Sequence, residues 1–554
     1  MGRSGYIALS FVECYNITEY EDKRMKKILY MLMSILLLIG SFILINQLQQ
    51  KNFTVFNNIS ADEITFIKEQ KQEVEEIGFT ALLCNEIRVP FDEATNTFFV
   101  PVDMNTEKWE SMKFESGQPE IQILFKEDIT EEKKKEVIAS GKKQELFVYS
   151  SESWAEYYVT FTGLPIIDLA TNEGFYAAEN ITGQVVFFDT DFLVHGTQQS
   201  EYKGHIRGNT SRMFPKKGYK INLIKTNPEN VSELNKLSLF GMRKDDDWIL
   251  HALYNDDTKI RDRLSMAIWD AMGAKEISEK SYYGPKMTYV EVFADNSYCG
   301  LYGLMEPVDA KQLNLSEEDY LYKRKNSGGF NYESFNESED PYEVINGFEI
   351  KEGEMKSDAW KPIAELALLT YSSDEAYNYY ISDLVDIDNA ARLWLFLQVI
   401  TGLDHTAKNV FYVAKYENDQ YKFYFAPWDL DLTWGCVSVG EVNSVYTAFE
   451  RDTVDDRIYW ETGNRIMELD CNHAVEKMQT MYLEMRNNLL SDENVERIIT
   501  ELDNELRFSG AFTRDKSRWG DSVHAVDTSE LIVYAKERLS FLDKALFDFS
   551  IFVD

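Results

Sequence analysis

Four polar side chains in the C-terminal half are of the types that bind a divalent cation beside a free carboxylate. Asp404 and Asn409 are five positions apart, and Asp429 and Asp431 follow them in the segment PWDLD. Carboxylate and amide oxygens are hard ligands that suit Mg²⁺ or Mn²⁺, and Mg²⁺ bound to phosphates needs few protein carboxylates. We therefore predict a cluster of oxygen ligands beside one carboxylate that binds no metal.

A β-hairpin is needed to bring these two pairs of residues together. The intervening chain has two apolar, aromatic-rich segments, 410–416 and 421–426, separated by the turn-like residues 417–420. This pattern predicts two strands joined by a tight turn. Such a hairpin folds Asp404 and Asn409 back toward the PWDLD segment.

An apolar helix predicted at 389–401 places the first pair. Asp388 precedes it as a candidate N-cap, and the helix is apolar over most of its circumference. A helix that is apolar on nearly all sides is buried. We expect a central helix whose C-terminal end presents Asp404.

The order of these residues is also typical of protein kinases. Kinases place a catalytic Asp, a metal-binding Asn five residues on, and a separate metal-binding Asp after a strand. The alternative is that the residues only form turns, where Asp and Asn are common because they hydrogen-bond to the local backbone. The PWDLD segment favours a site, because it crowds carboxylates into a stretch otherwise fit for burial, and a buried charge needs a partner such as a cation.

Charge and length limit the partners of the protein. The chain has 554 residues and a net charge of −37, with 57 Lys and Arg against 94 Asp and Glu. Because nucleic-acid binding requires a basic surface, we expect no nucleic-acid partner. The hydrophobic content of 44% indicates a folded protein.

A basic island interrupts this acidic chain. Six Lys or Arg residues fall between Lys203 and Lys220, around a loop rich in Gly, Asn, Thr and Ser. Backbone N–H groups and cationic side chains together can bind phosphates. The alternative is an ordinary basic hairpin that balances a neighbouring acidic face.

A possible hinge follows two further predicted strands. Residues 287–294 and 299–305 are predicted as strands, Glu306 to Val308 follow them, and a short helix is predicted at 310–315. A kinase holds the base of its nucleotide with elements in this order, a strand followed by an acidic hinge and a helix.

The N-terminal region predicts a membrane anchor. Residues 28–46 are uncharged and apolar enough to span a bilayer, and Lys and Arg residues precede them. We expect a cytoplasmic N-terminus at 1–27, an uncleaved signal anchor at 28–46, a stalk with a small β-rich domain at 47–155, and the main domain at 156–550. The five cysteines show no zinc-ligand spacing.

Several segments together resemble the spore-coat protein H (CotH) kinase family. They are GHIRGNTSRMFPKKGYKINL, NDDTKIRDRLSMAIWDAMG, GLYGLMEPVDAKQL, GLDHTAKNVFYV, FAPWDLDLTWG and KERLSFLD, which occur in the order typical of the family. The resemblance extends from about Leu164 to Leu546. It implies an α+β fold, with an atypical protein-kinase-like two-lobed domain preceded by the anchor and the small β-rich domain.

The resemblance also implies roles for individual residues. Asp404 would be the catalytic base, Asp429 the principal metal ligand, and Asn409 and Asp431 secondary ligands. The residues implied to bind ATP are Arg207, Lys216 and Lys217, with Lys220 as a further candidate, and Glu306 and Val308 at the hinge. The predicted helix at 259–272 departs from ordinary kinases because it has no Glu to pair with the phosphate-binding lysine.

The resemblance implies an ATP-dependent protein kinase that uses Mg²⁺ or Mn²⁺. With the predicted anchor, it would be a single-pass protein of the cell membrane whose catalytic domain lies outside the cytoplasm and phosphorylates surface or spore-coat proteins. One alternative is a non-catalytic adhesin or envelope assembly factor that keeps the fold. Another is a metal-dependent hydrolase, for which His405 is the single candidate histidine ligand.

Overall fold

The structure is a computed structural model, and it describes most of the chain after residue 60. The described residues are 61–548, apart from 104–111, 127–133, 209, 228–231, 274–283, 327, 407, 440–445 and 521–525. The predicted cytoplasmic segment at 1–27 and the predicted anchor at 28–46 lie outside the described residues. Among those described, no helix has both the length and the apolar character needed to cross a membrane.

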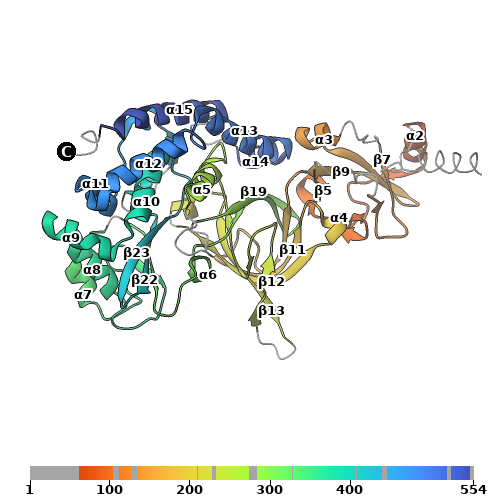
Figure 1. Cartoon of the computed structure of the whole chain (residues 1–554). Coiled ribbons are helices and arrows are strands. Elements are labelled where there is room, and N and C mark those ends of the chain that lie inside the picture. The colour runs from red at the N-terminus through yellow and green to blue at the C-terminus, as the bar shows by residue number, and fades with distance from the viewer. Residues whose placement is uncertain are drawn as a thin grey trace, which may run out of the picture.

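Three parts follow one another along the chain (Figure 1). An N-terminal sheet lies at one end, a β-barrel lies in the middle, and a helical part with a small sheet lies at the other end. Helices from the C-terminal region extend back over the barrel toward the N-terminal sheet. The chain is therefore a mixed α+β structure, and the kinase-like two-lobed arrangement stays a prediction.

The N-terminal part contains a six-stranded sheet with strand order β4-β5-β9-β8-β7, in which β1 pairs with β9, and a three-stranded sheet with order β3-β2-β6. The long strand β9 begins at Ser153, so the predicted boundary at 155/156 falls inside it. Because β9 pairs with β5 on one side and β8 on the other, this β-rich part continues to Thr162. The elements of this part are α2 (Ala61–Gln70), β1 (Gln72–Glu73), β2 (Leu83–Cys84), β3 (Ile87–Arg88), β4 (Phe91–Asp92), β5 (Thr97–Pro101), β6 (Phe114–Glu115), β7 (Gln122–Phe125), α3 (Lys134–Ser140), β8 (Gln144–Tyr149) and β9 (Ser153–Thr162).

The central part is an eight-stranded sheet that closes on itself. Its strand order is β12-β11-β10-β18-β19-β17-β13-β14, and an additional pairing of β12 with β13 completes a barrel that leaves only β14 outside the circuit. Among these pairings, β10 with β18 is parallel and the others are antiparallel. The strands are β10 (Ile166–Thr171), β11 (Asn180–Phe188), β12 (Gln198–Arg207), β13 (Gly218–Thr226), β14 (Ser232–Leu234), β17 (Asp247–His251), β18 (Met287–Ala294) and β19 (Ser297–Met305).

Side chains of alternate residues fill the barrel. Strands that are half-buried alternate between core and solvent, and β13 shows that alternation along Tyr219, Ile221 and Leu223. The cluster that these strands enclose includes Ile167, Val185, Phe187, Trp248, Leu250 and Leu304. The interior of the barrel is therefore filled by packed side chains.

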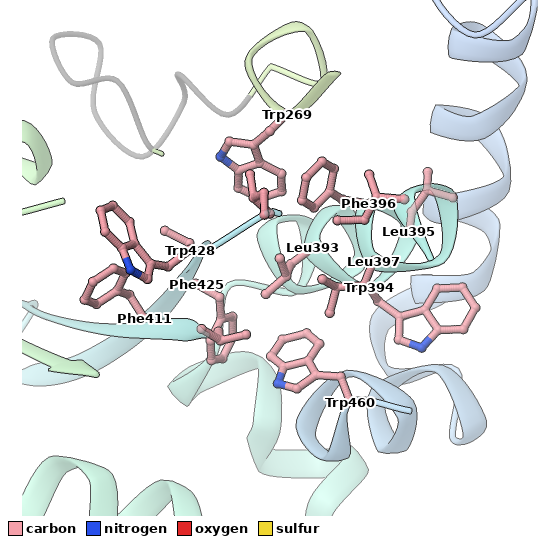
Figure 2. Packing of buried hydrophobic residues seen from close by; sticks show 14 of the residues in the cluster. Trp269, Leu393, Trp394, Leu395, Phe396, Leu397, Phe411, Phe425, Trp428 and Trp460 are labelled. Carbon is pink, nitrogen blue, oxygen red and sulfur yellow. The ribbon is translucent and has the colours of Figure 1, made fainter. Parts of the chain in front are cut away.

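The C-terminal part is organised around the buried helix α10 (Ile387–Ile400). Leu393, Leu395 and Leu397 are fully buried, and so is Phe396, which contacts Trp269 at 5.0 Å between ring centroids. Figure 2 shows these side chains of α10 packed among aromatic residues from separate elements. The prediction of a central buried helix is confirmed.

The N-cap of α10 differs from the prediction. Asp386, not Asp388, is the cap, because Asp386 has extended backbone and accepts a hydrogen bond from the backbone N–H of Asn389 at 2.8 Å. Asp388 lies inside the first turn, where its carboxylate pairs with Lys477 at 2.7 Å. Carboxylates are stabilised in the first turn by the helix dipole, so both residues favour this helix start.

A small sheet with order β21-β20-β22-β23 lies against this helix. The Gly-, Ser-, Glu- and Asn-rich composition of residues 326–358 predicts a long loop, but this segment contains α7 (Tyr332–Glu337) and β21 (Phe348–Glu352). The hairpin strands are β22 (Val410–Glu417) and β23 (Gln420–Pro427), as predicted. The other elements from here to the end, with those between the barrel strands, are α4 (Phe192–His195), β15 (Leu237–Ser238), β16 (Lys244–Asp245), α5 (Arg261–Ala271), α6 (Ala310–Leu313), β20 (Tyr320–Arg324), α7 (Tyr332–Glu337), β21 (Phe348–Glu352), α8 (Lys361–Thr370), α9 (Asp374–Leu384), β24 (Cys436–Val439), β25 (Tyr446–Phe449), α11 (Glu461–Glu468), α12 (Ala474–Arg486), α13 (Asp492–Phe508), α14 (Ala511–Trp519) and α15 (Thr528–Ala545).

Candidate functional site

The base of the β22–β23 hairpin brings the predicted site residues together. Val410 pairs with Pro427 at the end of the ladder, and one step beyond it the backbone N–H of Trp428 donates to the carbonyl of Asn409 at 2.9 Å. Asp429 is the next residue. The hairpin therefore folds Asn409 and Asp429 to the same end of the sheet.

The backbone is in the left-handed region at both of these residues. The φ angle is 60° at Asn409 and 59° at Asp429. Among residues with side chains, Asn and Asp reach this region most readily. Their identities suit the tight bends that the chain makes on entering and leaving the hairpin, and those bends set the direction of the two side chains.

Asp404 lies in a short 3₁₀ turn, Leu403–His405, directly after α10. One carboxylate oxygen accepts from Asn409 Nδ2 at 2.7 Å, and the other pairs with Lys408 Nζ at 2.9 Å. Burial raises the pKa of Asp404, and the charge of Lys408 opposes that rise. The carboxylate is therefore oriented on both oxygens while it remains partly accessible.

His405 is buried and acts as a support. Its Nε2 lies 2.9 Å from the carbonyl of Trp428, so this nitrogen donates, and Nδ1 has no hydrogen-bond partner among the described residues. Burial lowers the pKa of His405, which favours the neutral ring. The ring joins the turn that bears Asp404 to the start of the PWDLD loop. The ring is fully buried, whereas the hydrolase alternative requires a ring nitrogen that a metal ion can reach.

Asp431 lies deeper than Asp429. Its carboxylate accepts from Asn255 Nδ2 at 2.5 Å and from the backbone N–H of Leu432 at 2.9 Å. Burial, with the nearby carboxylates of Asp429 and Asp262, raises the pKa of Asp431 to about 8. This side chain therefore holds a proton at neutral pH unless a cation approaches it.

A buried His–Asp pair lies behind Asp431. His251, at the end of β17, lies 3.1 Å from the carboxylate of Asp262 in α5. Burial alone would lower the pKa of His251, but the charge and hydrogen bond of Asp262, together with the charge of Asp431, outweigh burial and raise that pKa overall. The polar cluster thus joins the barrel, α5 and the PWDLD loop.

The donor set fits one divalent cation. The Asp429 carboxylate is half-buried, and it makes no hydrogen bond or ion pair within the described part of the chain. Asn409 gives its amide N–H to Asp404, so its amide oxygen is the atom left for a ligand. The described residues contain no group of three His, Cys, Asp or Glu side chains that could hold a metal. Mg²⁺ bound to phosphates commonly takes one or two carboxylates, so the set does not need a third.

Two cations lie near Trp428 and Asp429. The Arg207 guanidinium is 5.5 Å from the Trp428 ring, and Lys323 Nζ is 5.6 Å from it. Burial lowers the pKa of Arg207, and the carboxylates of Asp429 and Asp431 oppose that shift. Burial likewise lowers the pKa of Lys323 to about 8, with Asp429 as the opposing charge. Arg207 thus lies near the carboxylates of Asp429 and Asp431, and its contact with ATP stays a prediction.

The predicted phosphate-binding lysines are engaged elsewhere. Lys216 is fully buried, and its Nζ donates to Asp515 in α14 at 2.6 Å and to the carbonyl of Leu301 at 2.5 Å. Gly300 makes room for this pair, because a Cβ there would lie 2.4 Å from the Asp515 carboxylate. Lys217 donates to the carbonyl of Arg212 at 2.5 Å. Neither lysine has a described contact with Asp404 or Asp429.

Lys220 and the hinge residues are also held by protein partners. Lys220 pairs with Asp247 at 2.9 Å. Glu306 is buried and accepts from the backbone N–H of Arg243 at 2.9 Å, while Val308 is buried in the core. The predicted hinge is therefore a well-anchored turn between β19 and α6, and its contact with a nucleotide stays a prediction.

Several residues at the site were not singled out from the sequence. Lys408 could have been identified from its spacing, because it lies four residues after Asp404 and its amino group pairs with the Asp404 carboxylate. Lys323 reaches the site through the pairing of β20 with β22, across a long separation in the sequence. Asn255 and His251 likewise depend on tertiary packing, which no local pattern reveals.

Comparison with known proteins adds one finding. A model of the family described as CotH kinase protein matches residues 205–542, which is more than half of the chain and includes all of the predicted site residues. A search of curated proteins gives no match.

The raised pKa of Asp431 generates a prediction for the metal-free protein. Between its ordinary value of 3.8 and about 8, this carboxyl is protonated in the folded state and ionised in the unfolded state. Its contribution to stability is therefore full at acid pH and is lost as pH rises through about 8. We expect Asp431→Asn to flatten the fall of melting temperature between pH 5 and pH 8.5, measured with a chelator present.

The matched control is Asp419→Asn, which makes the same substitution in the exposed turn of the same hairpin. It should leave the pH profile of the wild-type protein unchanged. Parallel profiles for the wild-type protein and Asp431→Asn would contradict the raised pKa.

Proposed function

The chain belongs to the CotH kinase protein family, and from that premise we propose that it transfers a phosphoryl group from ATP to serine or threonine hydroxyls of surface or spore-envelope proteins. The observation that supports this most is the 2.7 Å contact between Asn409 and Asp404 at the hairpin base, beside Asp429. That contact supports the proposal because it joins the candidate proton acceptor to a candidate metal ligand, and phosphoryl transfer requires both.

Asp404 would orient the acceptor hydroxyl and take its proton. As the hydroxyl oxygen forms a bond to the γ-phosphorus, the bond from that phosphorus to the bridging oxygen of ADP breaks, and ADP leaves with that electron pair. The contacts with Lys408 and Asn409 fix the carboxylate before substrate arrives. Such pre-organisation lowers the barrier because no reorientation is needed during the reaction.

Asp429 and the amide oxygen of Asn409 would hold Mg²⁺ or Mn²⁺, which supplies positive charge against the ATP phosphates. Asp431 would support this set from behind. Its contact with Asn255 fixes the carboxylate, and its raised pKa is the property of an acidic group that lacks a cation. A protein that bound no nucleotide would have no use for this arrangement, which weighs against the adhesin alternative.

We also propose that the catalytic domain lies outside the cytoplasm, held by the anchor at 28–46. The support is the sequence, in which basic residues precede the apolar run. Protease added to intact cells is expected to cut the chain after Gln50. Complete protection of that region while the membrane is sealed would contradict this placement.

Asn substitutions at two carboxylates separate catalysis from binding. Asp404→Asn keeps the size of the side chain but removes the proton acceptor, so ATP binding with Mn²⁺ should stay near the wild-type value. Phosphate transfer should fall by about 10²- to 10⁴-fold, the usual contribution of a general base. Asp429→Asn should weaken both metal-dependent ATP binding and transfer. Binding is measured by calorimetry and transfer with labelled ATP.

Asp419→Asn serves again as the control and should bind and transfer normally. Full transfer activity in Asp404→Asn would remove the assignment of the base. A wild-type protein that binds no nucleotide with either metal would favour the adhesin or assembly-factor alternative.

A further inference from the structure

Arg207 and Lys323 stand out among the cationic side chains of the described residues. Most lysines and arginines near them meet a carboxylate, as Lys220 meets Asp247 at 2.9 Å and Lys325 meets Glu349 at 2.9 Å. No ion pair or side-chain hydrogen bond of Arg207 or Lys323 is found in the described part of the chain. In a chain with a net charge of −37, two such cations at one aromatic ring need an explanation.

The two cations come from different parts of the fold and meet at one aromatic ring. Arg207 is the last residue of the barrel strand β12, and Lys323 lies in β20 of the C-terminal sheet. The distances to the Trp428 ring centroid are 5.5 Å from Arg207 Cζ and 5.6 Å from Lys323 Nζ. Lys323 Nζ also lies 5.8 Å from the ring of Phe411, which Figure 2 shows beside Trp428.

Strand register explains how Lys323 reaches this position. Lys323 pairs with Phe411 across the β20–β22 ladder, and the carbonyl of the next residue, Arg324, accepts from the N–H of Asn409 at 3.1 Å. The lysine is therefore fixed one step from the metal-ligand candidate Asn409. It lies on the same hairpin base as Asp429.

A purely structural role does not explain why Arg207 and Lys323 both lie at the Trp428 ring. Contact with an aromatic face offsets only part of the cost of burying a cation. Two like charges at one ring repel each other, and an apolar side chain would cover Trp428 without that repulsion. An anion between the cations removes the repulsion. Phosphate oxygens suit both, since Arg can bind two oxygens at once and Lys acts as a point charge.

We propose that Lys323 and Arg207 form a clamp for the phosphate chain of the nucleotide, and this inference rests on the proposed function above. Lys323 approaches the phosphates from β20 and Arg207 from the barrel, with the metal ligands Asp429 and Asn409 beside them. The clamp assigns to Lys323 the contact that the sequence assigned to Lys217, whose amino group is held by a backbone carbonyl.

The test compares three variants of the full-length chain. Lys323→Met keeps an aliphatic stem against Phe411 and Trp428 but removes the charge. Lys323→Arg keeps the charge. Lys325→Met is the matched control, because Lys325 is two residues further along the chain and its amino group pairs with Glu349 at 2.9 Å. Binding of ATP and of inorganic tripolyphosphate is measured by calorimetry with Mn²⁺ present, and melting temperature reports folding.

Loss of one charge-assisted contact weakens binding by about 10- to 100-fold. We expect Lys323→Met to weaken ATP and tripolyphosphate binding by similar factors in this range, with its melting temperature kept. Lys323→Arg should retain most of the affinity, and Lys325→Met should bind as the wild type does. Unchanged ATP binding in Lys323→Met would overturn the clamp, as would a loss for ATP without a loss for tripolyphosphate.

The two probes also separate this inference from the proposed function. If the wild type binds tripolyphosphate through Lys323 but does not bind ATP, the clamp stands and the kinase proposal fails. If the wild type binds ATP but Lys323→Met binds it equally well, the kinase proposal stands and the clamp fails. A wild type that binds neither probe overturns both.

Discussion

The closure of the β22–β23 hairpin is the constraint on which the candidate site depends. One hydrogen bond, from the N–H of Trp428 to the carbonyl of Asn409, joins the chain entering the hairpin to the chain leaving it. His405 makes a second link, to the carbonyl of Trp428. The buried leucines and Phe396 of α10 pack into the core (Figure 2), and the turn that bears Asp404 follows the C-terminal end of this helix. A close-packed interior resists displacement of its side chains, so the polar groups attached to this core are held in fixed positions.

Charge is distributed unevenly around this closure. Asp429, Asp431 and Asp262 gather on one side, and Arg207 and Lys323 face them from two other elements. Opposite charges near one another stabilise the site, but burial penalises each of them, which is why the pKa of Asp431 rises while that of Lys323 falls. A bound metal ion would neutralise the carboxylates, and bound phosphates would neutralise Arg207 and Lys323.

The sequence predicted those features that depend on local pattern. The alternation and turn residues of the hairpin, the apolar circumference of α10 and the strand pair β18–β19 all appear as predicted. The hairpin alone was enough to place Asn409 near Asp429. The family resemblance was confirmed by the match over residues 205–542.

Long-range pairing limited the rest of the prediction. The closure of the barrel through β12 and β13, and the membership of β9 in the N-terminal sheet, depend on contacts that no local window contains. The same limit applies to cations. Lys216 and Lys323 are both lysines near aromatic residues, but the first is paired with Asp515 from a distant helix while the second faces the site. Only the tertiary structure distinguishes them.

The central claim is that one metal ion and a nucleotide meet at the hairpin base. It is tested most directly by anomalous diffraction from crystals grown with Mn²⁺ and a non-hydrolysable ATP analogue. The account predicts an Mn²⁺ peak within coordination distance, about 2.1 Å, of oxygens of Asp429 and Asn409 and of the nucleotide phosphates. A peak bound elsewhere, or a nucleotide that binds away from Asp429 and Asn409, would contradict it.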